Sequence, residues 1–495
     1  MHYISTRGGT TAADGLHSAD AIKKGLCADG GLFMPEQIPQ IGKYDLVKLS
    51  TMTYPQRAAF IMGKFLTDYD PAELLNDCTA AYDESRFPGG PAPLHTLTEN
   101  NRVLELWHGP TCAFKDMALQ IMPKLLSRSL AITGESKDAF ILVATSGDTG
   151  KAALEGYRDV DRVRIMVYYP VDGVSKMQKL QMATQEGNNV SVCAIRGNFD
   201  DAQSGVKAIF SNADAAQALA EKGLFFSSAN SINWGRLVPQ IVYYFSAYAD
   251  LLESGALRLG DPINVCVPTG NFGNIFAAYL AKQMGLPIAK FICASNQNNI
   301  LTDFFRTGCY DRNRAFHTTI SPSMDILISS NLERYLYLRA GAKKTAQYME
   351  QLRQTGKYTV TPEIFADIQK EFCGYYCDEE NTRATIRETY EAHRYLIDPH
   401  TAVAVSCAQQ YQQQTQDDTL TVIASTASPY KFPASVLGAL SKNVPEDEFE
   451  ALEALHQKTG APVPAPLSAL RTKSVRFDTV IDAQQMLEQT LSAAE

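Results

Sequence analysis

The sequence predicts an α/β fold with parallel sheets flanked by helices, preceded by an N-terminal domain. From about residue 96 onward, short apolar runs typical of strands alternate with segments of helical periodicity. Such alternation is typical of parallel sheets that helices cover on both faces. Two of the runs continue into a glycine turn and then into a helical pattern, at residues 140–150 and 265–274. With 495 residues and 45% hydrophobic content, the chain has room for about three domains or subdomains.

The N-terminal domain is predicted to span residues 1–95. It contains helical patterns at 56–66 and 71–82 and ends in a Pro/Gly-rich segment at 87–93 that indicates a linker. Residues 96–495 are predicted to form one larger region, with a smaller α/β subdomain at about 138–235 inserted in it. The predicted strands of this region are 103–106, 139–144, 163–168, 190–194, 263–267, 290–294 and 420–424, and a helical stretch runs from about 331 to 370.

Composition argues against several classes of protein. The net charge of −9 disfavours a nucleic-acid-binding protein, which usually carries a basic face. The ten cysteines form neither a Cys-x-x-Cys pair nor a short secreted framework, so we expect reduced thiols and no metal site. The first residues lack the apolar core of a signal peptide and no run of about 18 apolar residues occurs, which predicts a cytoplasmic protein without a membrane segment.

Lys115 is the most informative single residue of the chain. It lies in the segment 107–116, directly before an amphipathic helical pattern that extends to about residue 130. A lysine on a loop that opens a helix can be a nucleophile, although most lysines at such places are solvated surface charges. Its interpretation therefore depends on the other motifs.

Two glycine turns are candidate anion sites. A strand that turns tightly into a helix leaves the first helical N–H groups without partners, and these groups favour a phosphate or a carboxylate. The turn at 269–274 precedes a helical pattern at 275–284, but it could also be a plain strand-to-helix turn, and its spacing is not that of a nucleotide-binding Gly-x-Gly-x-x-Gly motif. The turn at 145–150 adds hydroxyl groups, which could grip an anion or simply cap the following helix.

One amine nucleophile and two anion sites suit an enzyme that holds a phosphorylated cofactor as a Schiff base beside an acidic substrate. Three other segments carry polar groups. The hydroxyls at 425–431 follow a predicted strand, and His400 is more simply a structural or solvent-facing histidine than a catalyst. Arg236, in the segment 230–236, could clamp a phosphate or form a surface ion pair.

Taken together, these segments resemble threonine synthases of the long bacterial and fungal type. One of them is His108-Gly-Pro-Thr-Cys-Ala-Phe-Lys-Asp116, and the others, in family order, are residues 3–8, 144–150, 230–236, 269–274, 321–326 with 330–334, and 398–401. The least family-like parts are about 340–390 and the tail after 440. The resemblance implies the tryptophan-synthase-β-like fold of pyridoxal-phosphate (PLP) enzymes, fold type II, with an added N-terminal domain.

The resemblance also implies roles for individual residues. Lys115 would form the Schiff base with PLP, and Thr426 would meet the pyridine nitrogen. The cofactor phosphate would be held by Gly270, Asn271, Phe272, Gly273 and Asn274. The substrate would be bound by Ser146, Gly147, Asp148 and Thr149, with Lys151, Asn233 and Arg236 as weaker candidates for its phosphate group. Related PLP enzymes carry Asn where this chain has Asp148, so the contact to the cofactor's 3-hydroxyl stays open.

The implied reaction converts O-phospho-L-homoserine and water into L-threonine and phosphate, the last step of threonine biosynthesis, and makes the protein a PLP-dependent lyase. The alternatives are a PLP-dependent serine or threonine dehydratase, a threonine-synthase-like protein that binds phosphorylated ligands without turnover, and a nucleotide-dependent oxidoreductase. We expect a small-molecule substrate, no nucleic-acid or membrane partner, and a monomer or homodimer.

Overall fold

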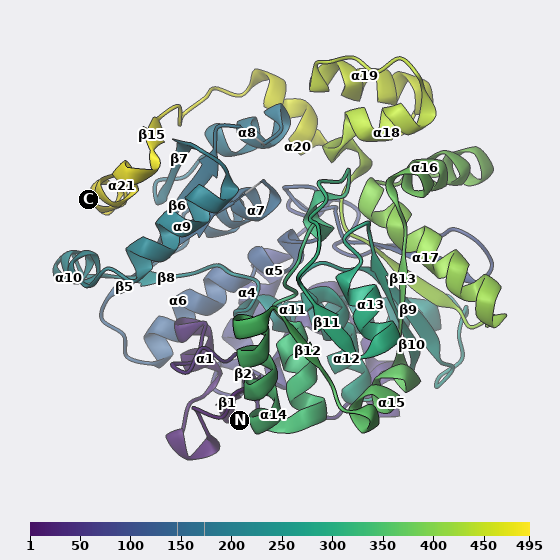
Figure 1. Cartoon of the computed structure of the whole chain (residues 1–495), viewed down its shortest axis with the longest axis horizontal. Helices are drawn as coiled ribbons and strands as arrows, with labels where there is room; N and C mark the ends of the chain where they lie inside the picture. The colour runs from purple at the N-terminus through teal and green to yellow at the C-terminus, as the bar shows by residue number, and fades with distance from the viewer. Residues whose placement is uncertain (146, 173) are drawn as a thin grey trace.

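The computed structural model describes residues 1–145, 147–172 and 174–495, and two sheets organise it (Figure 1). The larger sheet has six strands in the order β13-β10-β9-β14-β4-β3. All neighbours in it pair in parallel except β3 with β4. Its strands are β3 (Leu94–Thr96), β4 (Asn101–Glu105), β9 (Ile263–Pro268), β10 (Ile288–Ser295), β13 (Phe372–Tyr376) and β14 (Thr421–Ser425).

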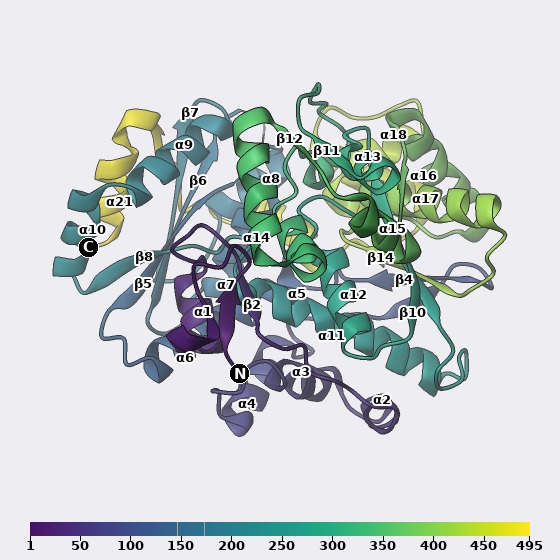
Figure 2. The ribbon, with the colours of Figure 1, turned by 60° about the horizontal axis from the view of Figure 1, so that its bottom comes forward.

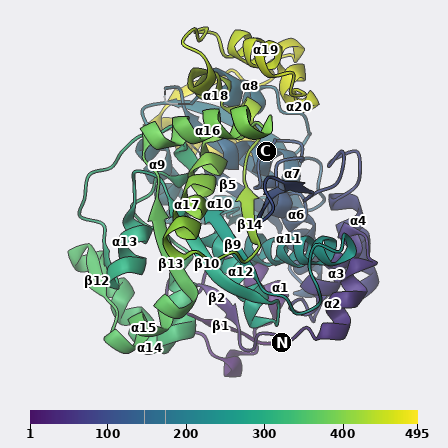
Figure 3. The same cartoon turned by 90° about the vertical axis from the view of Figure 1, so that its right-hand side faces the viewer.

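Helices cover both faces of the larger sheet, which confirms the predicted class of fold. Successive side chains of a strand point to opposite faces, so Val265 and Val267 of β9 join one core cluster while Cys266 joins another. The first cluster includes residues of α11 (Trp234–Glu253) and α12 (Gly273–Gln283). The second includes residues of α17 (Pro399–Thr415), which packs on β9, β10 and β14 (Figure 3).

The smaller sheet has five strands, all parallel, in the order β15-β7-β6-β5-β8. Four of them lie in the segment 138–235: β5 (Asp138–Ala144), β6 (Val163–Pro170), β7 (Val190–Arg196) and β8 (Leu224–Ser227). The fifth, β15 (Val480–Asp482), comes from the C-terminal end of the chain. Helix α21 (Met486–Ala493) follows it and packs against α9 (Phe199–Phe210) and α10 (Ala213–Glu221). Three residues carry too little pattern for β15 to be predicted from sequence.

The N-terminal elements gather on one side of the molecule (Figure 2). They are β1 (Tyr3–Ser5), α1 (Ser18–Lys24), β2 (Phe33–Pro35), α2 (Lys43–Ser50), α3 (Tyr54–Gly63) and α4 (Pro71–Ala81). Strands β1 and β2 pair in antiparallel fashion, and α2 and α3 pack against α11. Helix α1 packs against α6 (Met122–Ile132). The boundary near residue 95 stays a prediction.

Helix α11 is the central packing element. Asn233 caps it, since the side-chain oxygen of Asn233 accepts a hydrogen bond from the Gly235 N–H group at 2.8 Å. Seventeen of its twenty residues are buried, so the helix meets neighbours on all sides. These neighbours include α2, α3, α5 (Asp116–Leu119) and α12, which places α11 between the N-terminal elements and the larger sheet.

The predicted helical stretch 331–370 was too long. It consists of α14 (Leu332–Thr355), the short strand β12 (Lys357–Thr359) and α15 (Pro362–Glu371). Gly356 ends α14 because it adopts a positive φ of 78°, which glycine tolerates best, and β12 then pairs with β11 (Cys309–Asp311). The other helices are α7 (Asp148–Tyr157), α8 (Lys176–Ala183), α13 (Ile300–Thr307), α16 (Glu379–His393), α18 (Pro433–Leu440), α19 (Glu448–Thr459) and α20 (Ala465–Ser468).

All ten cysteines are free thiols, in agreement with the prediction from their spacing. Among the described residues, no helix combines the length and the apolar character needed to cross a membrane.

The C-terminal segment should contribute measurably to stability through Met486. Its side chain is 1% exposed in the core of the smaller sheet, and the Tyr168 hydroxyl donates to the Met486 carbonyl oxygen at 2.8 Å. We expect Met486→Ala to lower the free energy of unfolding by about 2–4 kcal/mol, because the substitution leaves a cavity. Urea denaturation of this variant and of Glu488→Ala, an exposed neighbour on the same helix, measures the effect. Equal small losses in both would contradict the packing of α21.

Candidate active site

The candidate site residues gather at the carboxyl ends of parallel strands. Three neighbouring strands of the larger sheet, β9, β14 and β4, lead into the glycine turn at 269–274, into Thr426 and into the loop that carries Lys115. Strand β5 of the smaller sheet leads into the second glycine turn at 145–150. Ligands of open α/β sheets bind at this edge, so the fold brings together motifs that are far apart in sequence.

Lys115 directly precedes α5, and its side chain is 12% exposed. Its amine donates a hydrogen bond to the Ser323 hydroxyl at 3.3 Å and lies 3.7 Å from a carboxylate oxygen of Asp148. Burial lowers the pKa of Lys115, and the attraction of Asp148 opposes this effect. A lysine with a lowered pKa has a larger fraction of neutral amine near pH 7, which is the form that acts as nucleophile or base.

Asp148 begins α7 and is shared by several donors. The Lys431 amine lies 2.8 Å from one of its oxygens, and the Gln178 side-chain amide donates to the same oxygen at 3.1 Å. Although burial acts to raise the pKa of Asp148, the charges of Lys431 and Lys115 lower it well below its usual range. Asp148 is therefore a carboxylate at any physiological pH.

The turn before α7 is held by Thr145. Its hydroxyl oxygen accepts hydrogen bonds from the Gly147 and Gly150 N–H groups, both at 3.0 Å. Gly147 has a φ of 150°, and a Cβ atom there would come within 2.5 Å of the Gln178 side chain. The expected cap by Ser or Asp is not seen among the described residues, because Gly147 is the N-cap and the Asp148 carboxylate contacts Lys431 and Gln178 instead. Gly147 and Thr149 lie at the helix N-terminus, where an anion is favoured. Ser146 lies outside the described residues.

The turn at 269–274 forms a close cradle at the N-terminus of α12. Phe272 adopts the left-handed conformation with φ 64°, and the helix begins at Gly273. At Gly270, a Cβ atom would lie 2.5 Å from the Ser323 carbonyl oxygen, so only glycine fits beneath that loop. The Gly270 carbonyl accepts from the Ser329 hydroxyl at 2.7 Å, and the Asn271 carbonyl accepts from the Asn331 backbone N–H at 3.0 Å. Hydrogen bonds from Ser329 and Asn331 thus hold the conformation of the turn.

The cradle suits a phosphate group. The N–H groups of the first turn of α12 have no intrahelical partners by the geometry of a helix, and they point a positive partial charge outward. The buried side-chain amide nitrogen of Asn274 is also without a partner among the described residues, while its oxygen accepts from the Tyr244 hydroxyl. An unused buried donor is costly unless a ligand or water satisfies it, so the residues present fit the phosphate of PLP.

Thr426 follows β14 and faces the Lys115 loop. Its backbone carbonyl accepts from the Phe114 N–H group at 2.8 Å, and its side chain is buried. A bridge between Ala113 and Ala427 closes the same contact. The backbone of Thr426 is therefore positioned next to the residue that precedes Lys115, and a contact of its hydroxyl with the pyridine nitrogen stays a prediction.

His400 has a structural role, as the sequence favoured, although it is buried rather than solvent-facing. Its Nδ1 atom lies 2.6 Å from an oxygen of Asp398, and its Nε2 atom accepts from the Ser323 N–H group at 3.1 Å. The imidazole thereby fixes the loop whose Ser323 hydroxyl meets Lys115.

The weaker candidates for the substrate phosphate differ in how their polar groups are used. Arg236 is buried without a carboxylate partner among the described residues; it donates to the Ala229 carbonyl at 2.9 Å, and its Nε atom has no partner. Burial lowers the pKa of Arg236 to about 10, so it stays charged at pH 7. Lys151 already contacts Gln185 at 2.5 Å and Glu155 at 3.5 Å, and Asn233 is the cap of α11.

Sequence reasoning missed four groups that the fold adds to the site: Lys431, Ser323, Gln178 and the Asp116–Thr111 pair. Thr111 donates to the buried Asp116 carboxylate through its N–H and its hydroxyl, at 2.8 and 2.7 Å. Lys431 lies in the segment 425–431, which follows a predicted strand, and Ser323 lies in the family-like segment 321–326. The charge of Lys431 within its segment was the signal that sequence reasoning could have used.

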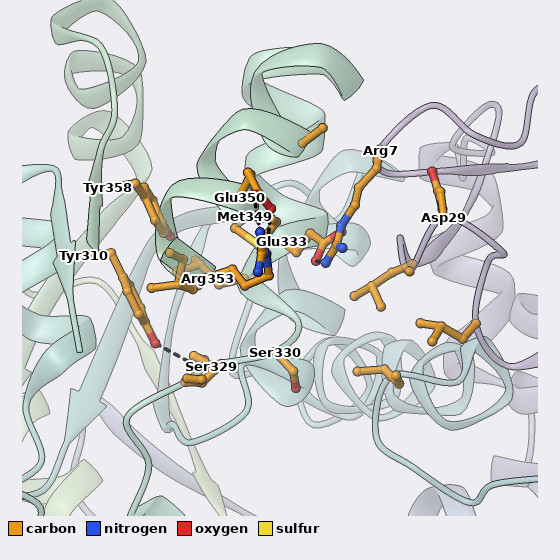
Figure 4. Close-up of a pocket in the computed structure, with 18 of the residues that line it drawn as sticks. Arg7, Asp29, Tyr310, Ser329, Ser330, Glu333, Met349, Glu350, Arg353 and Tyr358 are labelled. Atoms are coloured by element: carbon orange, nitrogen blue, oxygen red, sulfur yellow. Dashed lines mark hydrogen bonds and ion pairs between the residues drawn. The ribbon is translucent and has the colours of Figure 1, made fainter. Parts of the chain in front are cut away.

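The 910 Å³ pocket in Figure 4 is lined in part by Ser329, Ser330 and Glu333, and Ser329 is one of the residues that fix the 269–274 turn. Arg7 points across it to Glu333, with contacts of 2.9 and 2.8 Å. The Thr6 hydroxyl donates to the same carboxylate at 2.6 Å. Ser329, which holds Gly270, donates its backbone N–H group to the Tyr310 hydroxyl oxygen at 2.8 Å. The N-terminal strand is therefore linked to the glycine turn through residues 329–333.

Family models match most of the chain. The model "Threonine synthase N terminus" matches residues 2–82, "Pyridoxal-phosphate dependent enzyme" matches 88–426, and "Threonine synthase, C-terminal" matches 401–490. Together, the fold and the site define a pyridoxal-phosphate-dependent enzyme of fold type II, whose cofactor is pyridoxal 5'-phosphate.

Individual relatives narrow this class. Threonine synthase of Pseudomonas aeruginosa is 40% identical over 88% of this chain and 90% of its own. The crystal structure of PLP-bound threonine synthase from Brucella melitensis superposes with a TM-score of 0.88 at 35% identity, covering 100% of this chain and 99% of that one. Human threonine synthase-like 1 is 41% identical over 85% of this chain, which spans 58% of the length of that relative. The chain belongs to the threonine synthase family.

The link from Arg7 to the glycine turn predicts an effect on cofactor binding. Arg7→Leu leaves the buried Glu333 carboxylate without its guanidinium partner, which should shift the 329–333 segment that holds the turn. Because Arg7 is 30% exposed, we expect a moderate loss, about a five- to thirtyfold higher PLP dissociation constant. Fluorescence titration of the cofactor-free protein measures it. Arg353→Leu, which removes an exposed ion pair at the same pocket, is the control and should change the constant little.

Proposed function

We propose that the protein is a threonine synthase, which converts O-phospho-L-homoserine and water into L-threonine and phosphate. The observation that favours this reaction is a second, separate positive site. Lys115 and the 269–274 cradle account for PLP, and Arg236 remains as a buried cation whose charge acts on Lys115 and which no carboxylate of the described residues balances. A substrate that carries its own phosphate supplies that missing negative charge.

The substrate carboxylate is assigned to the N-terminus of α7. Gly147, Asp148 and Thr149 line this end, and Thr145 already satisfies two of its N–H groups. The remaining N–H groups and the Thr149 hydroxyl suit a carboxylate. Arg236 is the strongest of the three candidates for the substrate phosphate, because the polar groups of Lys151 and Asn233 already have partners.

PLP, when bound, supplies an aldehyde for amines and an electron sink for a carbanion at the substrate Cα. Lys115 would hold the cofactor through its amine, and once free that amine would act as the base that removes the Cα proton of the substrate. The same amine would also remove a proton from Cβ, so that the phosphate can leave from Cγ with its charge neutralised by Arg236. A proton delivered to Cγ would give the methyl group of threonine, water would add its hydroxyl group at Cβ, and return of a proton to Cα would complete the product.

Thr426 tunes the cofactor in this scheme. A hydroxyl can donate to a neutral pyridine nitrogen, whereas a carboxylate would favour the pyridinium form. The electron sink is then weaker, so more of the stabilisation falls on groups such as Lys115 and the residues around it.

We also infer that the protein works in the cytoplasm, as a monomer or homodimer, on a small-molecule substrate and without a nucleic-acid partner. The net charge of −9 and the ten free thiols support this setting.

The decisive test is the release of phosphate from O-phospho-L-homoserine by the PLP-loaded protein, with threonine measured in the same sample. Equal amounts of the two products establish the reaction. Deamination of serine or threonine without use of the phosphorylated substrate would favour the dehydratase. Tight binding of the phosphorylated substrate with no product would favour a binding protein.

A further inference from the structure

Lys431 is a buried lysine that lies beside the carboxylate nearest to Lys115. Its side chain is 1% exposed, and its amine lies 2.8 Å from one oxygen of Asp148. The same amine donates to the Thr111 carbonyl at 2.9 Å. The Lys115 amine lies 3.7 Å from the other oxygen of Asp148. Two lysines thus share one carboxylate, and Lys431 holds the closer position.

This arrangement decides which lysine carries a proton. A carboxylate that is 6% exposed would form an ion pair with Lys115 if Lys431 were absent, since a buried carboxylate needs a cation beside it. Lys115 would then be held as an ammonium, which is neither a nucleophile nor a base. With Lys431 present, Asp148 is already satisfied, and a second positive charge at Lys115 is repelled.

We propose that Lys431 is a positioning residue that occupies Asp148 and thereby keeps the Lys115 amine uncharged and reactive near neutral pH. The ion pair of Lys431 with Asp148 carries no net charge, so it adds none beside Lys115.

Charged groups from four elements face Lys115: Asp148 from α7, Lys431 from the segment after β14, Arg236 from α11 and Asp116 from α5. Burial, Lys431 and Arg236 lower the pKa of Lys115, whereas Asp148 and Asp116 raise it. Two further titratable groups, Cys112 and Lys151, belong to the same cluster. The charges of Lys431 and Asp116 act on the pKa of Cys112, and the charge of Asp116 acts on the pKa of Lys151. Removing Lys431 takes away one charge that lowers the pKa of Lys115 and frees Asp148, which raises that pKa. Both changes therefore raise the pKa of Lys115.

The role rests on Lys115 as the PLP-binding lysine and does not depend on which substrate the enzyme takes. It can be tested by a double-mutant cycle of Lys431→Met and Asp148→Asn in the full-length protein. PLP is removed, and its recapture is followed between about pH 6 and pH 10 through the absorbance of the lysine-bound cofactor. In parallel, an amine reagent labels the cofactor-free protein, and the labelled Lys115 peptide is quantified by mass spectrometry.

Lys431→Met should move the midpoint of both profiles up by about one pH unit, which is about tenfold lower reactivity at pH 7. Asp148→Asn should move the midpoint down, because the repulsion by Lys431 is then unopposed. The double variant should return close to the wild-type midpoint, and Lys431→Arg, which keeps the charge, should stay there. A merely structural lysine would weaken PLP binding without these opposite shifts.

The role of Lys431 would be overturned if the midpoint of Lys431→Met equalled that of the wild type. It would also be overturned if the midpoint of the double variant equalled that of Lys431→Met. If Lys431→Met does not fold by circular dichroism, the downward shift in Asp148→Asn and the midpoint of the double variant still decide it. Wild-type protein that labels at Lys115 but never captures PLP there would instead reject the cofactor site. Failure to make threonine would reject only the proposed reaction.

Discussion

Replacing Lys115 with alanine should abolish both the absorbance of lysine-bound PLP and the formation of threonine. The reason is that, in the proposed mechanism, one amine serves as the covalent anchor and as the base at the substrate Cα. Loss of a positioned general base alone lowers a rate by about 10²–10⁴-fold, and loss of the covalent anchor adds to this. We therefore expect kcat to fall by at least about 10⁴-fold.

The measurement is a spectrum of the PLP-loaded variant together with the phosphate and threonine assay. Lys124→Ala is a suitable control, because Lys124 is a partly buried lysine on the neighbouring helix α6 whose pKa burial also lowers. The control should keep both the spectrum and the activity. Turnover by Lys115→Ala at the wild-type rate would contradict the mechanism, whatever its spectrum.

Replacing Arg236 with glutamine should give the next largest loss. Truncating a buried charged partner of a ligand costs about 2–5 kcal/mol, which corresponds to a fall in kcat/KM for O-phospho-L-homoserine of at least about thirtyfold. The loss should appear mainly in KM if Arg236 binds the phosphate equally strongly in the ground state and in the transition state. It should appear in kcat if Arg236 binds the phosphate more strongly as it leaves.

Lys151→Gln provides the comparison, since the Lys151 amine is already bound by Gln185 and Glu155. Lys151→Gln should lower kcat/KM less than Arg236→Gln does. The PLP spectrum of both variants should be unchanged, which separates loss of substrate binding from loss of cofactor. An Arg236→Gln variant with wild-type kcat/KM would remove this arginine from the substrate site and leave Lys151 and Asn233 to be tested.

The sequence was sufficient for the parallel-sheet fold because the longer strands and helices carry a local periodicity. The apolar run at 139–144 became β5, Asp138–Ala144, and the run at 263–267 became β9, Ile263–Pro268. The same locality explains the failures. The predicted helix that starts at 331 was extended across β12, because the three residues of β12 beside Gly356 give no strand signal. Strand β15 was missed because it joins a sheet whose other strands lie more than 250 residues earlier in the chain.

By itself, the sequence determined the family and the cofactor, and it predicted which lysine would bind that cofactor, because all three are encoded in short motifs whose residues are adjacent in the chain. The tertiary structure alone decided which side chains surround that lysine. Ser323, Lys431 and Arg236 come from three different segments, and they meet Lys115 or influence its charge only because the strands end at one edge. Charge interactions depend on distance in space and on burial, and neither of these can be read from order along the chain.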